Sequence, residues 1–411
     1  MMKRILSLSL LLVVVCLALV GCGKSDIEKS KEYIEENDLV NNNPKLTLSF
    51  CLVTDSKLNV AALSTMENQF NALLEISHNT HLDFINLTTA EYASYLESKL
   101  EAVKDAREND DGSDADDIVL GNAFPEVKDT QFDILLITSF DMLIDLVNDG
   151  HIYELTDFLE STKYRNIKNY VTESFLTEAQ LDERSFAIPN CTLMGEYTYL
   201  LVDKAAAAKY GYFIESDFTD WESTAELRAA IEEAGDYTFT SDEDPNAPVR
   251  LVKGNYETRA TFGSNVYSYV EKTPSANRSV IFNSMLAISA YSVNPDRAMQ
   301  ILYAINSVPE YRTMLQYGVL NTTYNLKNGV VEIPANAPYT YTVNPYYVGN
   351  LFALYPCKDL GQTAALMEGW KLQNNELTFT DDLPAYTLPE SVLPETPETT
   401  TPPTTSAPEA E

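Results

Sequence analysis

Residues 132–138 read FDILLIT, and this stretch decides the fold class that we expect. After Asp133, four large apolar residues stand in a row, so both faces of such a strand need to be covered. This is typical of parallel sheets with helices on both faces. Ser139 follows directly and can cap a helix, which Gly150 can end. A buried strand that leads straight into a helix predicts an α/β domain with a mostly parallel sheet.

The same alternation of strands and helices continues on both sides of this stretch. Upstream, Thr88 and Glu91 form a capping box for a helix that follows a strand. Downstream, Asn294 and Pro295 open another helix with a cap and a proline in the first turn. Strands are predicted over 46–53, 81–87, 186–189, 197–202 and 285–288. The folded body is therefore expected to span roughly residues 45–383.

Both ends of the chain differ from this body. Residues 1–22 begin with a short basic segment and continue as an apolar run too short for an ordinary membrane span. They end in Leu19-Val20-Gly21-Cys22, which resembles a bacterial lipobox and implies a lipoprotein signal peptide with acylation, palmitate included, at Cys22. The alternative is an ordinary secretory signal with an incidental cysteine. Residues 23–44 read as a tether, and 384–411 as a disordered tail rich in Pro, Thr and Glu.

The composition excludes several classes of function. The chain has 28 basic and 61 acidic residues, a net charge of −33, which would repel a nucleic-acid backbone. Three His and five Cys leave little for metal or thiol chemistry, so no metal and no cofactor are expected. Beside Cys22, the body holds Cys51, Cys191 and Cys357. We expect free buried thiols there, although one disulfide is possible.

Three stretches, in this order, resemble the extracellular solute-binding proteins of ABC importers, the group that contains maltose-binding protein. They are FDILLI (132–137) with LVNDGHIYEL (146–155), SFAIP (185–189) with LLVDK (200–204) and KYG (209–211), and SMLAISAYSVNPDRAM (284–299). Residues 313–324 and Gly349-Asn350 resemble a Gram-positive lipoprotein branch of that group. Each motif is short, and their order and spacing carry the resemblance.

The resemblance implies a two-lobed, periplasmic-binding-protein-like fold of type II, with a ligand cleft between the lobes and several hinge crossings. Lobe one is expected at 45–193 and 284–318, and lobe two at 194–283 and 319–383. The short stretch between Trp221 and Met285 predicts a small second lobe. The implied function is capture of a small molecule, first of all an oligosaccharide, by hinge closure, and its delivery to ABC permease subunits. The protein is expected to be a monomer on the outer face of the bacterial cell membrane, anchored by lipid.

Candidate ligand-binding residues follow strands, flank the hinge or belong to the 25 tyrosines of the chain. Ligands of open α/β sheets bind at the carboxyl ends of the strands, and tyrosine rings can cover a sugar while their hydroxyls form hydrogen bonds. The predicted set is Thr54, Asp55, Ser139, Phe140, Asp141, Glu196, Tyr197, Asn283, Asn344, Tyr346 and Tyr347. For each of these, a helix-entry turn, an exposed hinge charge or core packing is the alternative.

Two other functions remain open at this stage. A surface sensor or adhesion lipoprotein could use the same fold without transport. An extracellular glycosidase would need a carboxylate pair at catalytic spacing, and 61 acids make any single pair uninformative. Because the chain has none of the common catalytic signatures, we predict that it is not an enzyme.

Overall fold

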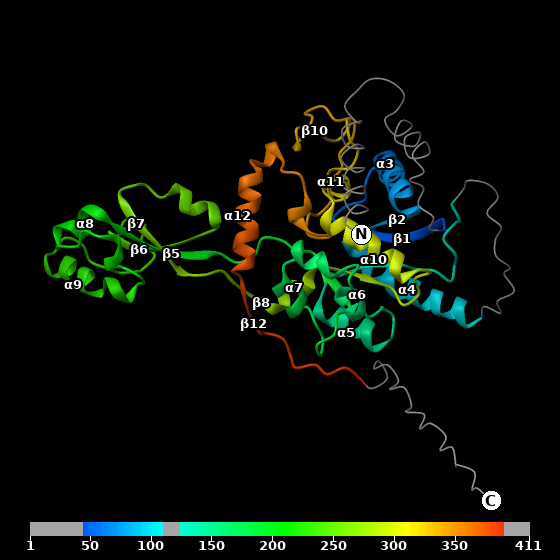
Figure 1. Ribbon diagram of the computed structural model, residues 1–411, viewed down its shortest axis with the longest axis horizontal. Helices are drawn as coiled ribbons and strands as arrows, with labels where there is room; N and C mark the ends of the chain where they lie inside the picture. Colours follow the sequence, from blue (N-terminus) through cyan, green and yellow to red (C-terminus); the bar gives the residue numbers. More distant parts are fainter. Residues whose placement is uncertain (1–43, 110–123, 390–411) are drawn as a thin grey trace, which may run out of the picture.

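The computed structural model describes residues 44–109 and 124–389. In it the chain forms a large lobe and a small lobe, with α12 (Ala364–Asn375) between them (Figure 1). The predicted signal peptide, Cys22 and nearly all of the tether and tail lie outside the described residues. The first tail residues, 384–389, pack on the large lobe: Tyr386 donates a hydrogen bond to Asn148, and Leu388 is buried.

The large lobe is built on a five-stranded sheet in the order β2-β1-β3-β9-β4. Its strands are β1 (Leu46–Thr54), β2 (Thr80–Thr88), β3 (Ile134–Ile137), β4 (Ala187–Pro189) and β9 (Met285–Ile288). β1 runs parallel to β2 and β3, whereas β9 runs antiparallel to β3 and β4. The chain leaves this lobe after β4 and re-enters it at the same edge of the sheet, so β9 must run in the opposite direction. The sheet is therefore mixed, although most of its strands run one way as predicted.

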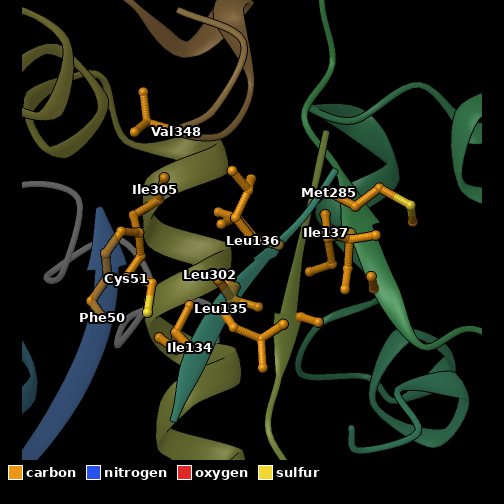
Figure 2. Close-up of a cluster of buried hydrophobic side chains, with 14 of the residues drawn as sticks. Phe50, Cys51, Ile134, Leu135, Leu136, Ile137, Met285, Leu302, Ile305 and Val348 are labelled. Carbon is orange, nitrogen blue, oxygen red and sulfur yellow. The ribbon is translucent and has the colours of Figure 1, made fainter. Parts of the chain in front are cut away.

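Helices cover this sheet, and their ends agree with the local sequence. Ser139 accepts a hydrogen bond from the Met142 N–H at 3.1 Å, and Asn294 caps its helix in the same way. The helices are α3 (Val60–His78), α4 (Thr89–Glu108), α5 (Phe140–Asn148), α6 (Thr156–Glu160), α7 (Glu173–Glu178), α10 (Pro295–Ser307) and α11 (Pro309–Tyr317), with 3₁₀ turns η1 (Arg165–Asn169), η6 (Leu351–Ala353) and η7 (Lys358–Leu360). Figure 2 shows Leu135 and Leu136 of β3 beside Leu302 of α10 in the main core.

Asp133, the one acid in FDILLIT, is fully buried where β3 begins. Its carboxylate accepts hydrogen bonds from the Ser49 N–H at 2.9 Å, from Gln131 at 2.7 Å and from the Ser292 hydroxyl at 2.6 Å. These donors come from three separate parts of the chain. Asp133 therefore joins β1, β3 and the loop after β9 at the end of the sheet opposite the predicted cleft, and its role is structural.

The small lobe has a three-stranded sheet in the order β6-β5-β7. Its elements are β5 (Tyr197–Asp203), α8 (Lys204–Lys209), η2 (Glu215–Asp217), η3 (Glu222–Thr224), α9 (Ala225–Glu233), β6 (Val249–Gly254), η4 (Tyr256–Thr261) and β7 (Val266–Lys272). Leu200 and Val202 face the core that includes α8 and α9, while Tyr197, Tyr199 and Leu201 face the other side. The lobe is small, as the short stretch between Trp221 and Met285 predicted.

The predicted boundary of lobe two needs one correction. Residues 319–357 were assigned to it, but they pack into the core of the large lobe. Val319, Tyr324, Val331, Val343, Val348, Phe352 and Cys357 all belong to that core, and Val348 is visible beside Ile305 of α10 (Figure 2). This segment contains the hairpin of β10 (Asn325–Lys327) and β11 (Val330–Glu332). It has neither a helical nor an alternating pattern, so its burial is set by contact with α10 and α11.

Three further elements lie where the lobes join. They are β8 (Ser275–Asn277), η5 (Arg278–Asn283) and β12 (Thr378–Thr380), and β8 pairs in parallel with β12. Cys51, Cys191 and Cys357 are free and buried, in agreement with the expectation of free thiols. Within the described ranges, each helix is too short or too polar to cross a membrane.

Candidate functional site

The register of the large sheet brings several polar residues to one edge. Phe50 lies opposite Ile134, Ile137 opposite Met285, and Pro189 opposite Met285. The residues after β1, β3 and β4, and those before β9, therefore lie along the same edge, and it is from this edge that the chain leaves for the small lobe. Open α/β sheets bind ligands at this place.

A pocket of about 340 Å³ lies at this junction of the lobes. This volume is at the lower end of the range for small-molecule sites. The loop after β4, the turn η5 with its exit, and the segment 344–347 form its walls. Its eleven lining residues are Asn190, Thr192, Leu193, Met194, Val280, Ile281, Asn283, Ser284, Asn344, Tyr346 and Tyr347.

The lining of this hinge pocket carries no charged side chain, although the whole chain has a net charge of −33. The lining combines three amides and four hydroxyl groups with four aliphatic or thioether side chains. Such a mixture suits a neutral ligand that has hydroxyl groups on its rim and an apolar face. Within the described residues, no group of three or more His, Cys, Asp or Glu side chains could hold a metal ion.

The wall formed by 344–347 is tied to the large lobe by buried donors. Asn190 and Ser284 both donate hydrogen bonds to the backbone carbonyl of Tyr346, and Asn190 also donates to the Ser284 hydroxyl at 2.8 Å. Among the described residues, the buried Oδ1 of Asn190 has no hydrogen-bond partner. One further donor reaches this wall from α11.

Arg312 on α11 is the further donor to the wall formed by 344–347, and its side chain is fully buried. Its guanidinium donates to the carbonyl oxygen of Pro345 at 2.7 Å and to Gln316 at 3.1 Å. Burial lowers the pKa of Arg312 to about 9, which reflects the cost of holding a cation away from water. We infer that Arg312 serves to position the pocket wall.

Three chain segments meet at Gly195, beside the pocket. Gly195 has φ +64°, and a Cβ there would lie 2.9 Å from both Leu377 Cδ1 and the Ser275 oxygen. Only glycine combines this backbone conformation with so close an approach. This crossing point is the natural place for a hinge between the lobes.

The helix α12 joins both sides of this crossing. Gln373, fully buried, accepts a hydrogen bond from the Tyr256 N–H at 2.7 Å and donates one to the Gly195 carbonyl at 2.7 Å. Asn374 donates to the Thr192 carbonyl at 2.6 Å. One helix thus contacts η4 of the small lobe and the loop that lines the pocket.

The predicted site residues fall into two groups. Asn283, Asn344, Tyr346 and Tyr347 all line the hinge pocket. Asp55 is exposed at the end of β1; burial and the nearby Asp55 carboxylate raise the pKa of Tyr347. The residues that follow β1 are thus within electrostatic reach of the pocket wall.

The remaining predicted residues have structural contacts or are exposed. Thr54 is buried and donates to the Ser56 carbonyl at 2.8 Å, and Ser139 caps α5 with the exposed Asp141 in its first turn. Phe140 packs edge-on against Phe282 at 4.9 Å between ring centres.

Glu196 and Tyr197, at the start of β5, lie outside the pocket lining. Glu196 is exposed, and Tyr197 is buried and donates to Glu376 at 3.1 Å. Burial and this hydrogen bond raise the pKa of Tyr197. Both positions belong to the hinge rather than to the pocket.

Sequence reasoning missed Asn190, Ser284 and the apolar residues of the pocket. Asn190 directly follows β4, whose sequence is AIP, much as Thr138 and Ser139 follow β3. A polar residue directly after a buried strand was therefore the available signal. No such signal marks the apolar lining residues, which are Leu193, Met194, Val280 and Ile281. They line the pocket only because the segments that cross between the lobes pack together there.

No family model matches the chain, and no curated protein matches its sequence. Among solved structures, the chain is similar to the N-glycan transport solute binding protein NgtS of Streptococcus pneumoniae, with 13% identity, coverage of 82% of this chain and 84% of that one, and a TM-score of 0.50. It is also similar to an extracellular solute-binding protein of family 1 from Alicyclobacillus acidocaldarius, with 13% identity, coverage of 84% and 89%, and a TM-score of 0.42. The similarity to NgtS confirms the predicted fold class: the chain has the two-lobed fold of an extracellular solute-binding protein.

Proposed function

We propose that this protein binds a neutral carbohydrate in the hinge pocket and delivers it to an ABC importer. The observation that carries the proposal is the uncharged lining of a pocket beside the segments that cross between the lobes, in a strongly acidic chain. A charged ligand would need a compensating ion pair to leave water. A sugar needs amide and hydroxyl partners and an apolar surface, which this lining provides.

Closure of the lobes would couple binding to delivery. The lining residues belong to the large lobe and to the segments that cross between the lobes, so a ligand held there presents its free face to the small lobe. Contact with that lobe would stabilise the closed form, and the importer is expected to select that form. The name of NgtS, which refers to N-glycan transport, agrees with a carbohydrate ligand.

The proposal includes the predicted location and partners. Acylation at Cys22 would hold a monomeric protein at the outer face of the cell membrane, where it would meet ABC permease subunits. Two or more acyl chains are needed for stable attachment. None of the eleven lining residues, all within the described ranges, carries a carboxylate, and this supports binding rather than glycoside cleavage.

The test is calorimetric titration of the purified protein with neutral oligosaccharides, acidic oligosaccharides, amino acids and short peptides. We expect binding of a neutral saccharide without its cleavage, and at least a tenfold loss of affinity in Tyr347→Ala. The matched control is Tyr153→Ala, which removes a 40% exposed tyrosine from another surface. Exclusive binding of charged ligands, or hydrolysis of the sugar, would contradict the proposal.

A further inference from the structure

A second concave surface lies on the large lobe, next to the hinge pocket along the chain. This groove has a volume of about 470 Å³ and is lined by the end of α11, by Thr323 and by residues of the segment 333–343. The next residues, 344–347, form a wall of the hinge pocket. The two concave surfaces therefore share one continuous stretch of chain.

The groove has the same chemical character as the hinge pocket. None of its lining residues is charged, and they include three tyrosines and three threonines. Tyr339 is partly buried, and Thr340 and Thr342 are exposed. Aromatic faces and hydroxyl groups in a neutral setting are suited to sugar rings.

The shared stretch is held firmly by α11. Gln316 donates to the Val343 carbonyl at 2.8 Å, the Tyr341 hydroxyl donates to the Leu315 carbonyl at 3.3 Å, and Arg312 donates to the Pro345 carbonyl. A Cβ on Gly318 would lie 2.5 Å from the ring of Tyr341, so this ring lies directly on the end of α11. Groove and pocket wall are therefore fixed to the same lobe and keep their relative position when the lobes move.

We propose that this groove is a second subsite for a long neutral oligosaccharide whose end lies in the hinge pocket. The inference rests on the proposed function and deepens it by assigning ligand length. Even fully extended, the chain from Tyr339 to Tyr346 spans no more than ~25 Å, so one oligosaccharide of several rings can reach both places. Because the groove belongs to the large lobe alone, it contributes affinity before the lobes close.

The experiment compares short and long ligands on the same variants. Disaccharides and hexasaccharides of the manno-, malto- and chito-series are titrated into the wild type, Tyr339→Ala and Ala337→Arg, the last of which fills the groove. In the series that binds, we expect the hexasaccharide to bind the wild type more tightly than the disaccharide. Both variants should weaken hexasaccharide binding five- to twentyfold and change disaccharide binding less than twofold. The control is again Tyr153→Ala, and melting temperatures check that each variant folds.

The outcomes separate the two proposals. Equal weakening of short and long ligands would mean that the variants disturb the pocket wall, and it would overturn the groove as a subsite. Unchanged binding of both lengths would also overturn it, while the proposed function would stand. If no neutral saccharide binds the wild type, the proposed function itself fails, and the groove proposal fails with it.

Discussion

The two lobes are built from similar elements but differ in how they are held together. The core of the large lobe is one cluster that runs from β1 to Leu388 and draws on most of the described elements outside the small lobe. The small lobe has two separate clusters, one on each face of β5. Its second face is rich in tyrosine, and η4 on that side is covered by α12. The comparison indicates that the core of the large lobe is stable without the small lobe, whereas the stability of the small lobe depends on its contact with α12.

Truncation of a core side chain in each lobe should give the largest effects. Phe70 is fully buried between α3 and the sheet, with Phe84 at 5.4 Å and Tyr311 at 5.1 Å between ring centres. Phe70→Ala should destabilise the large lobe by about 3–5 kcal/mol and lower hydrogen-exchange protection throughout its sheet.

Phe218, also fully buried, is the matching position in the small lobe. Phe218→Ala should lower protection in β5, β6 and β7 and leave β1 and β3 as they are in the wild type. Hydrogen exchange followed by mass spectrometry measures both variants. If Phe218→Ala lowered protection in β1 as much as in β5, the lobes would unfold as one unit and the comparison would be wrong.

A smaller effect is expected at the contact between α12 and the small lobe. Gln373→Ala leaves the Tyr256 N–H and the Gly195 carbonyl without their buried partner, at a cost of about 2–3 kcal/mol. We expect this loss to appear as faster exchange in η4 and β5 and as a wider opening of the lobes in X-ray scattering.

Gln373→Glu is the matched variant for this contact. It keeps an acceptor for Tyr256 but places a buried carboxylate oxygen against the Gly195 carbonyl, so at neutral pH its effect should be at least as large as that of Gln373→Ala. Equal exchange in the wild type and both variants would show that the small lobe does not need α12.

The smallest effect is a pH dependence between pH 7 and pH 5 that arises in the large lobe, where all three histidines of the chain lie. Burial, and the positive charges of Arg297 and Lys163, lower the pKa of His78 to about 4. The unfolded chain binds this proton near pH 6.5 and the folded protein does not. Stability is therefore full well above pH 6.5 and falls as the pH drops towards 4, by roughly 2 kcal/mol at pH 5.

His78→Gln should remove this slope. Denaturation midpoints of the wild type and the variant, measured from pH 7 to pH 4.5, give the difference directly, since other titrating groups are common to both. A wild-type curve parallel to that of the variant would contradict the assignment to His78.

Much of the large lobe could be predicted because its signals are local. Ser139 and Asn294 cap the helices that they were expected to cap. The segment 319–357 was predicted in the wrong lobe, because its tyrosines, prolines and asparagines have no period that shows which core they join. Its position depends on hydrogen-bond donors from another element, such as Arg312 on α11.

The candidate site also contains residues that the sequence could identify and residues whose role only the structure decided. Asn283, Asn344, Tyr346 and Tyr347 could be selected from their neighbourhood in the sequence, and all four line one pocket. Glu196 and Tyr197 carry equally suitable chemistry, but the start of β5 turns them towards solvent and α12. Residue type indicates what a side chain can bind, whereas the crossing of the lobes decides which side chains meet.

The sequence by itself determined the five strands of the large sheet and β5, the helix caps, the acidic character of the chain and the reduced size of the second lobe, since these depend on residue periodicity, local hydrogen bonds and composition. The reversal of β9, the docking of 319–357 on the large lobe and the neutral hinge pocket were decided only by tertiary structure. They arise where segments far apart in the chain return to the same edge of the sheet and satisfy one another's buried polar groups.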